Sequence, residues 1–204
     1  MEEVIRKLKE KYAVNIQESK HKQFAITVYP KNSIGEANQD VGYKLFNQEN
    51  DWFLVNLQRD KEYPLAQFTT KETGFFALYL ATIEKKDISN DPPLTELSQI
   101  EDNLENGEPI LKKSINIKFF SLKEEKKGAI YIYEENGKFN VYYLNLLGEK
   151  IWITKGRALS TSLEVVYNYA KRLEEFEEII APWKSTLSIQ LKDEELLKRT
   201  FIRK

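Results

Sequence analysis

The sequence offers few side chains that could perform catalysis. It contains one histidine, His21, within the polar run ESKHKQ, and it contains no cysteine. The absence of cysteine excludes disulfides, thiolate nucleophiles, zinc knuckles and iron–sulfur clusters, and a single histidine cannot build a histidine-based zinc site. We interpret His21 as a solvated loop residue, because the residues around it are polar.

One triplet has the spacing of a metal-dependent nuclease site. Glu124-Glu125-Lys126 contains the E-x-K pattern, and Asp102 could supply an upstream carboxylate. Such a site needs both carboxylates to converge on the metal, whereas the triplet lies in the charged run LKEEKKG, which is typical of a turn. The sequence also lacks a phosphate-binding glycine loop and a GxSxG motif. We therefore expect no enzymatic activity, no metal and no cofactor; a carboxylate-only metal enzyme is the alternative.

Lysines interleaved with aromatic residues could instead bind nucleic acid, because aromatic rings stack on bases and lysines contact phosphates. The formal net charge of −1 argues against it, since the chain has no global field that would attract a polyanion. Nucleic-acid binding is therefore kept as the alternative to protein binding. It would use Lys118, Lys123, Lys126 and Tyr131.

The segment 87–108 carries seven acidic residues and no basic residue. In a chain that is nearly balanced overall, this segment forms a local anionic surface, which would speed the capture of a basic partner and would be weakened by salt. The alternative is a solvated linker helix whose other face packs on the protein. The acidic residues that we expect to meet a partner are Asp91, Glu96, Glu101, Asp102, Glu105 and Glu108.

The elements that must position these residues are predicted from an internal repeat. Residues 42–57 (GYKLFNQENDWFLVNL) and 128–143 (GAIYIYEENGKFNVYY) align without a gap. Each is preceded by a candidate strand, at 24–29 and 115–120, and each is followed by another strand and a helix. The pattern predicts an α+β fold with internally duplicated strand–hairpin–strand–helix units, in which each antiparallel sheet is backed by a helix.

The register of both hairpins follows from their turns. Asn136-Gly137 is a strong signal for a two-residue type I′ turn, and the alignment places the turn of the first hairpin around Asn50-Asp51. We expect the matched apolar positions to face the core. The predicted pairs are Ile132 with Val141, Ile130 with Tyr143 and Glu134 with Phe139 in the second hairpin, and Phe46 with Val55 and Lys44 with Leu57 in the first.

The opposite face of both predicted hairpins is rich in aromatic and apolar residues. Tyrosine and tryptophan provide large contact areas with a polar tip and are enriched at interface hot spots. The alternative is that these faces are buried inside the protein. The face carries Tyr43, Leu45, Trp52 and Leu54 in the first hairpin and Tyr131, Tyr133, Tyr142 and Leu144 in the second; of these we expect Trp52, Tyr131, Tyr133 and Tyr142 to contact a partner.

Three regions are predicted along the chain. Residues 1–90 form the first repeat with an N-terminal helix, residues 91–110 an acidic linker helix, and residues 111–204 the second repeat with a C-terminal helix that packs on it or swaps out. The composition, with 41% hydrophobic and 31% charged residues, is typical of a globular protein. The start MEEVIRKLKEKYAV lacks the apolar region of a secretory signal, and no apolar run could span a bilayer. We expect a cytoplasmic protein without membrane contact.

With its acidic run 87–108 and the tyrosine face at 131, 133 and 142, the chain resembles the immunity proteins of bacterial toxin systems. This resemblance implies a non-enzymatic inhibitor that occludes a toxin by direct binding. It also implies a nuclease as the target, because inhibitors of nucleases carry anionic patches. The chain is similar in outline to phage-encoded inhibitors of bacterial defence and to secretion chaperones. A homodimer through an aromatic face is a further alternative.

Overall fold

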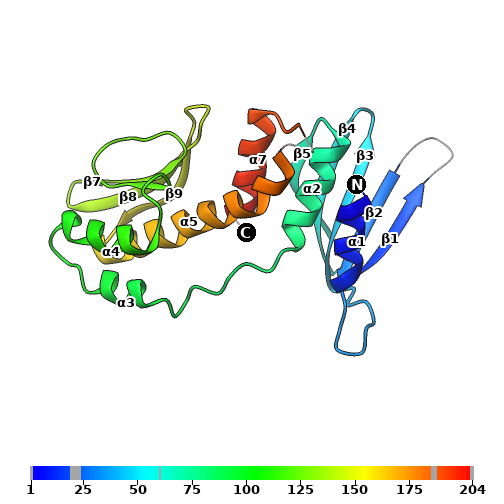
Figure 1. Ribbon diagram of the computed structural model, residues 1–204, viewed down its shortest axis with the longest axis horizontal. Coiled ribbons are helices and arrows are strands. Elements are labelled where there is room, and N and C mark those ends of the chain that lie inside the picture. Colours follow the sequence, from blue (N-terminus) through cyan, green and yellow to red (C-terminus); the bar gives the residue numbers. More distant parts are fainter. Residues whose placement is uncertain (1, 19–23, 60, 185–187, 203–204) are drawn as a thin grey trace. The chain divides into compact units, whose positions relative to one another are not determined.

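A computed structural model describes residues 2–18, 24–59, 61–184 and 188–202 and shows helices with two β-sheets, so the predicted α+β class is confirmed (Figure 1). The chain divides into two compact units, residues 1–84 with 187–204 and residues 85–186. His21 lies outside the described residues. None of the helices that the structure describes is long and apolar enough to cross a membrane.

The first unit is built on an antiparallel sheet whose five strands are neighbours in the order of the sequence. The first of them, formed by Tyr12–Glu18, was not predicted from the sequence; every one of its residues pairs with the following strand. The strands are β1 (Tyr12–Glu18), β2 (Phe24–Pro30), β3 (Val41–Gln48), β4 (Asp51–Gln58) and β5 (Lys61–Phe68).

Helices α1 (Glu2–Lys11), α2 (Lys71–Thr82) and α7 (Leu191–Ile202) complete the first unit. Helix α2 packs on β3, β4 and β5 and also contacts α1 and α7. This surrounded position matches its composition, because its residues are apolar on nearly every side. Thr70 begins the helix, and its side chain accepts a hydrogen bond from the backbone N–H of Thr73 at 3.2 Å.

The second unit contains a four-stranded mixed sheet in the order β6-β7-β8-β9. Its strands are β6 (Phe120–Ser121), β7 (Ala129–Glu135), β8 (Lys138–Leu144) and β9 (Lys150–Arg157), and β6 runs parallel to β7. The long helix α5 (Leu159–Ile180) packs on β7, β8 and β9, and α3 (Pro92–Ser98) packs on α5. The unit also holds α4 (Gly107–Ser114) and the 3₁₀ turns η1 (Leu104–Asn106) and η2 (Ala181–Trp183).

Two predicted elements of the second unit are wrong. The acidic linker is not one helix, because α3 ends at Ser98 and Asn103 begins η1, where its side chain accepts from the backbone N–H of Glu105 at 2.8 Å. The strand predicted at 115–120 is reduced to the two residues of β6. The side chain of Asn116 accepts from the N–H of Lys118 at 3.0 Å, a local turn that competes with extended structure.

The second hairpin has the predicted register, with Ile132 opposite Val141 and positive φ at Asn136 and Gly137. The first hairpin was predicted two residues out of register. Phe46 lies opposite Phe53, and Lys44 lies opposite Val55. The turn is formed by Glu49 and Asn50, with φ of 57° at Glu49.

The predicted internal duplication is not confirmed. The second hairpin buries the predicted core face, which carries Ile130 and Ile132, whereas the first buries the opposite face, which carries Leu45 and Leu54. The helices also differ, since α2 has 12 residues and α5 has 22, and only the second sheet begins with a parallel strand. The aligned sequences therefore share an alternating pattern without sharing the face that is covered.

The boundaries of the compact units also differ from the predicted regions. Helix α7 belongs to the first unit, because it packs on α2 and β5 and buries Leu197 and Phe201. Residues 85–90 belong to the second unit.

Candidate partner-binding surfaces

The register of the second sheet places Tyr131, Tyr142 and Trp152 in one row across β7, β8 and β9. The ring centroids of Tyr131 and Tyr142 lie 5.5 Å apart and those of Tyr142 and Trp152 lie 5.2 Å apart, both edge to face. Tyr133 lies two residues further along β7, with its ring stacked 6.2 Å from that of Tyr131. Cross-strand aromatic contacts of this kind stabilise a sheet. We call these four residues the aromatic face.

The aromatic face is turned away from α5. Neighbouring residues of a strand point to opposite sides of the sheet, and Ile130 and Ile132, which alternate with Tyr131 and Tyr133, are fully buried on the side that α5 covers. On the other side, Tyr142 is 0% exposed while Trp152 remains 40% exposed. The face thus has a packed centre and an accessible edge.

Polar contacts hold the centre of this face in place. The carboxylate of Glu125 accepts hydrogen bonds from the Tyr142 hydroxyl and the Lys150 ammonium. The hydrogen bond from Lys150, followed by that from Tyr142, lowers the pKa of Glu125, and the same contact with Glu125 raises the pKa of Lys150. Burial, followed by the hydrogen bond to Glu125, raises the pKa of Tyr142 to about 12. Tyr142 is therefore a neutral donor at neutral pH.

Two lysines lie against the rings of the aromatic face. The Nζ atom of Lys155 is 3.8 Å from the centre of the Trp152 ring, and that of Lys150 is 4.8 Å from the centre of the Tyr142 ring. An ammonium over an aromatic ring is attracted by the negative face of the ring. These contacts restrict the rings before any partner binds.

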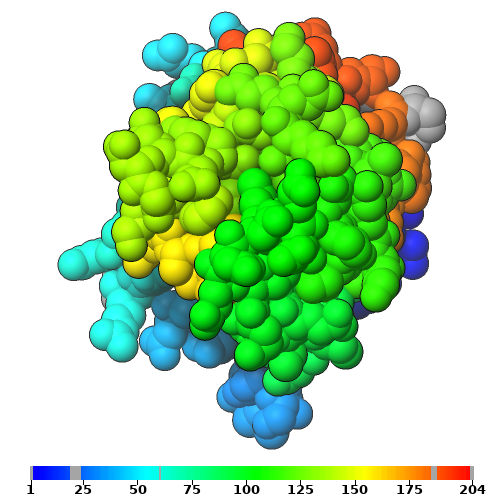
Figure 2. All heavy atoms as spheres, turned by 90° about the vertical axis from the view of Figure 1, so that its left-hand side faces the viewer, coloured from blue at the N-terminus to red at the C-terminus, as the bar shows by residue number. Residues whose placement is uncertain are grey.

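The structure separates the acidic residues from the aromatic face. Helix α3 packs on α5, which covers the sheet face opposite to the aromatic face, and η1 contacts α4. Figure 2 looks onto the end of the second unit where the segment from α3 to α4, in green, is exposed. The side chains that remain exposed there are Glu96, Glu101, Asp102 and Glu105; we call them the acidic patch.

The other two predicted acidic residues make contacts within the unit. Asp91 accepts a hydrogen bond from the hydroxyl of Tyr167 on α5 at 2.6 Å, and this contact, after burial, raises the pKa of Tyr167. Glu108 pairs with Lys112 at 2.8 Å and with Lys123 at 3.4 Å, and the hydrogen bond from Lys112 contributes most to lowering the pKa of Glu108. Both carboxylates join the linker to the rest of the unit.

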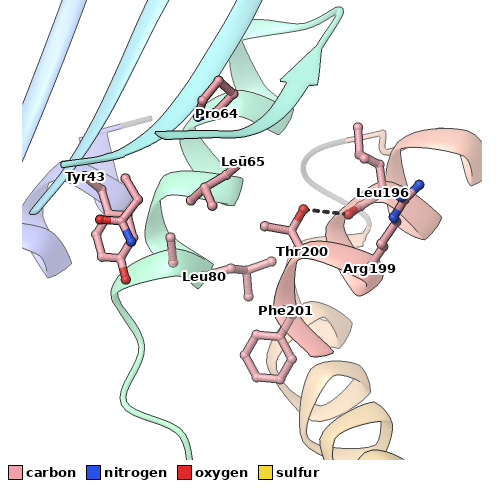
Figure 3. Close-up of a pocket in the computed structure, with 10 residues that line it drawn as sticks. Tyr43, Pro64, Leu65, Leu80, Leu196, Arg199, Thr200 and Phe201 are labelled. Atoms are coloured by element: carbon pink, nitrogen blue, oxygen red, sulfur yellow. Dashed lines mark hydrogen bonds between the residues drawn. The ribbon is translucent and has the colours of Figure 1, made fainter. Parts of the chain in front are cut away.

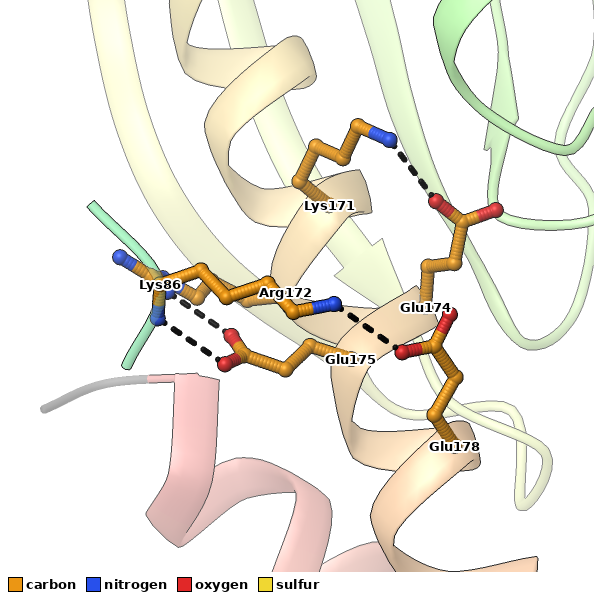
Figure 4. A network of polar contacts seen from close by, with 6 residues as sticks. All are labelled: Lys86, Lys171, Arg172, Glu174, Glu175 and Glu178. Carbon is orange, nitrogen blue, oxygen red and sulfur yellow. Dashed lines mark hydrogen bonds and ion pairs between the residues drawn. The ribbon is translucent and has the colours of Figure 1, made fainter. Parts of the chain in front are cut away.

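A charged network fastens the start of the linker to α5 (Figure 4). The backbone N–H of Lys86 donates to Glu175 at 3.0 Å, and its ammonium pairs with Glu178 at 3.2 Å. Arg172 pairs with Glu175 at 2.8 Å, and Lys171 pairs with Glu174 at 3.0 Å. The three basic and three acidic side chains balance in charge. Because Lys86 contacts two glutamates of α5, the network holds the start of the linker on this helix.

Trp52 does not join the three predicted tyrosines. It lies in the first unit and is only 9% exposed. Its ring packs 5.7 Å from Phe24 and 6.0 Å from Phe75 of α2, and the Lys71 ammonium lies 5.7 Å from its centre. Trp52 is therefore a core residue of the first unit.

The lysines considered for nucleic-acid binding make contacts within the protein, in or near the loop that leads to β7. Lys123 pairs with Glu108, Lys126 donates to the backbone carbonyl of Ile117 at 3.1 Å, and Lys118 lies 4.6 Å from the ring centre of Phe119. In the described part of the chain, no group of three or more histidine, aspartate or glutamate side chains is placed to hold a metal ion.

Sequence reasoning missed Trp152, Lys150 and Lys155 as parts of this surface. The signal was present in the alternating run Ile151-Trp152-Ile153, which indicates a strand with Trp152 on the face opposite to its neighbours. The bulges between β8 and β9, which pair Tyr142 with Trp152, could not be read from the sequence.

The fold and this surface together define an α+β protein of two compact units with an aromatic, lysine-bordered sheet face. No protein-family model matches the sequence, and no curated protein or solved structure matches it.

Proposed function

We propose that the chain is a non-enzymatic binding protein that docks on a protein partner through the aromatic face of its second unit. The observation that carries this proposal is the exposed edge of the face, where Trp152 is 40% exposed beside a fully buried Tyr142. Rings that are already fixed by packing lose little conformational freedom on binding, and tyrosine and tryptophan dominate interface hot spots.

The ring contacts favour a protein partner over a nucleic acid. Stacking of bases requires open ring faces. One face of Trp152 is occupied by the Lys155 ammonium, and the Tyr142 ring is enclosed by Tyr131, Tyr133 and Trp152. What the surface offers is ring edges and two ammonium groups, a mixture that suits the side chains and backbone carbonyls of a protein.

The resemblance to immunity proteins supports a specific form of this function, an inhibitor that occludes a toxin. The acidic patch supports a basic target such as a nuclease. Because the acidic patch is carried by α3, η1 and the loop between them, and not by the strands of the aromatic face, it would act by long-range attraction during encounter. Docking itself would occur on the aromatic face.

The test begins with purification of the tagged chain from its native lysate and identification of a stoichiometric protein partner. The purified partner is then titrated with Trp152→Ala and Tyr133→Ala, and with Tyr63→Ala as the control, since Tyr63 is 47% exposed in the first unit. We expect Trp152→Ala to weaken binding at least about 30-fold, the effect of a hot spot, and Tyr63→Ala to leave it unchanged. Equal affinity of all variants would contradict the proposal. Neutralisation of a partner that is toxic when expressed alone would establish inhibition.

Nucleic-acid binding is the second candidate, because Tyr131 and Tyr133 are stacked on a sheet face bordered by lysines. Titration of labelled single-stranded oligonucleotides at low and at physiological salt tests it. Binding that weakens steeply with salt and is lost in Tyr133→Ala would favour this candidate, whereas weak or salt-insensitive binding would rule it out.

A further inference from the structure

The first sheet has one edge, β1, that is open to pairing with another strand. A sheet edge presents unpaired N–H and C=O groups, and proteins protect such edges with proline, lysine, bulges, short strands or a covering element. In the part of the chain that the structure describes, β1 is an edge strand of seven residues at the outer side of the sheet (Figure 1). It pairs with β2 in unbroken register and contains no proline, glycine or lysine. Ile16 on this strand is 42% exposed.

The other edges of the two sheets are protected. Strand β5 contains Pro64, a bulge interrupts its pairing with β4, and α7 packs on it beside a cavity of about 370 Å³ (Figure 3). Strand β9 pairs with β8 through two bulges and carries Lys150, Lys155 and Arg157. Strand β6 has only two residues. This contrast singles out β1 as the edge that is available to a partner.

The hydrogen bonds of the first sheet show which backbone groups of β1 are free. The N–H of Lys31 donates to the carbonyl of Lys11 at 3.3 Å, just beyond the end of the strand pair. Hydrogen-bonded pairs alternate along an antiparallel ladder, so the odd-numbered residues of β1 exchange hydrogen bonds with β2. No described strand pairs with β1 on its other side. The residues whose N–H and C=O groups point to that side are Tyr12, Val14, Ile16 and Glu18.

We propose that β1 pairs antiparallel with β1 of a second copy of this chain, around a two-fold axis at Asn15. In this register Val14 lies opposite Ile16 of the second copy, and Tyr12 lies opposite Glu18 of the second copy. All the outward N–H and C=O groups of both strands are then paired. The two five-stranded sheets become one continuous sheet.

The side chains at this junction favour a second copy over an unrelated strand. Val14 and Ile16 pair with Val28 and Ile26 of β2 and share their face of the sheet. Their meeting across the axis therefore extends the apolar face and covers the exposed Ile16, as cross-strand apolar pairs do. Glu18, the one charged residue of β1, does not face its own copy. The register that joins the apolar residues is thus also the one that uses every free backbone group. This dimer is independent of the aromatic face and of the function proposed for it.

Sedimentation equilibrium of the full chain at increasing concentration tests the proposal. We expect a reversible dimer with a Kd below about 1 mM, because the interface is small. Ile16→Pro removes an N–H that points away from β2 and should raise the Kd by at least about 10-fold. Ile16→Lys, which places a charge on the edge, should act in the same direction. The controls Leu65→Lys on β5 and Trp152→Ala on the aromatic face, both at exposed positions, should keep the dimer. A chain that stays monomeric, or a dimer that survives both Ile16 variants, would overturn the proposal.

Single introduced thiols test the register, because the chain contains no cysteine. Facing residues of a non-hydrogen-bonded pair lie about 4.5 Å apart at Cα, within the reach of a disulfide. Asn15→Cys should therefore cross-link with its own copy under mild oxidation. Ala13→Cys and Gln17→Cys should not cross-link alone, since equivalent Cα atoms would lie about 13 Å apart, but should cross-link when the two variants are mixed. Cross-linking of Ala13→Cys alone, or none of Asn15→Cys, would contradict the register.

Discussion

The β3–β4 and β7–β8 hairpins carry aromatic rings on corresponding faces. A helix covers this face in the first hairpin, whereas in the second hairpin the helix covers the opposite face. In the first hairpin the face that carries Tyr43 and Trp52 is covered by α2, and Leu45 and Leu54 on it are fully buried. In the second hairpin the helix covers the other face, and the row from Tyr131 to Trp152 stays partly open. The same pattern of residues thus forms a core in one unit and a candidate interface in the other.

The difference lies in what each second face contains. The uncovered face of the first hairpin carries Lys44, and its ammonium pairs with Glu62 at 2.7 Å in a solvated position. The covered face of the second hairpin carries Ile130, Ile132, Val141 and the fully buried Tyr143, and its charged residue, Glu134, lies at the exposed end next to the turn. When one face of a sheet contains a lysine, burial of the other face avoids the cost of desolvating a charge. In the second hairpin the face opposite to the aromatic face is the more apolar of the two. Helix α5 covers that face, and the aromatic face stays partly open.

The comparison predicts its largest effect for the two tryptophans. Trp52→Ala should destabilise the first unit by about 3–5 kcal/mol, the usual cost of removing a large buried aromatic side chain. Trp152→Ala should destabilise the second unit by only roughly 1–2 kcal/mol, because less of its side chain is buried. Hydrogen exchange of the sheet amides reports each unit separately. Equal losses in the two units would show that the aromatic face is as much a core as its counterpart.

The glycines that align in the two hairpins should respond differently to the same substitutions. A Cβ on Gly42 would lie 2.7 Å from the backbone carbonyl of Val28, so Asn, the larger residue, should be worse than Ala, with losses of about 1–3 kcal/mol or more. Gly128 has φ of 81°, a conformation in which Asn is tolerated better than Ala by up to about 1 kcal/mol. The order of Ala and Asn should therefore reverse between the sites. Urea unfolding of the four variants measures it.

A smaller effect is expected at Glu125, which holds the centre of the aromatic face. Its pKa is lowered in the folded state by Lys150 and Tyr142, so its stabilising contribution is present at pH above the ordinary glutamate pKa and is lost as pH falls through the lowered value. Glu125→Gln should lower the urea midpoint at neutral pH, and this difference from the wild type should vanish in acid. Glu124→Gln, the exposed neighbour, serves as the control. A difference that persists in acid would show that the charge is not responsible.

The sequence was sufficient for the class of the fold and for the second hairpin, because Asn136-Gly137 specifies its turn and its alternation specifies its face. It was insufficient for the first hairpin. The turn at Glu49 and Asn50 has no glycine, so its position depended on the assumed repeat. The sequence identified three residues of the aromatic face but also selected Trp52, because alternation shows that two faces differ and tertiary packing decides which is covered. The cavity beside α7 depends on contacts between distant segments, and no local pattern predicts it.

The smallest effect on stability, with a measurable effect on rate, is expected for the acidic patch. Charge reversal at Glu101, Asp102 and Glu105 should change stability by less than about 0.5 kcal/mol, because these exposed side chains make no buried contact. The same variant should slow association with the identified partner at low salt, and the difference should shrink as salt screens the attraction. Reversal at Glu18, Glu36 and Glu49 of the first unit changes the net charge equally and separates local from global attraction. If both variants slow association alike, the net charge steers the partner, and if neither does, encounter depends on the aromatic face alone.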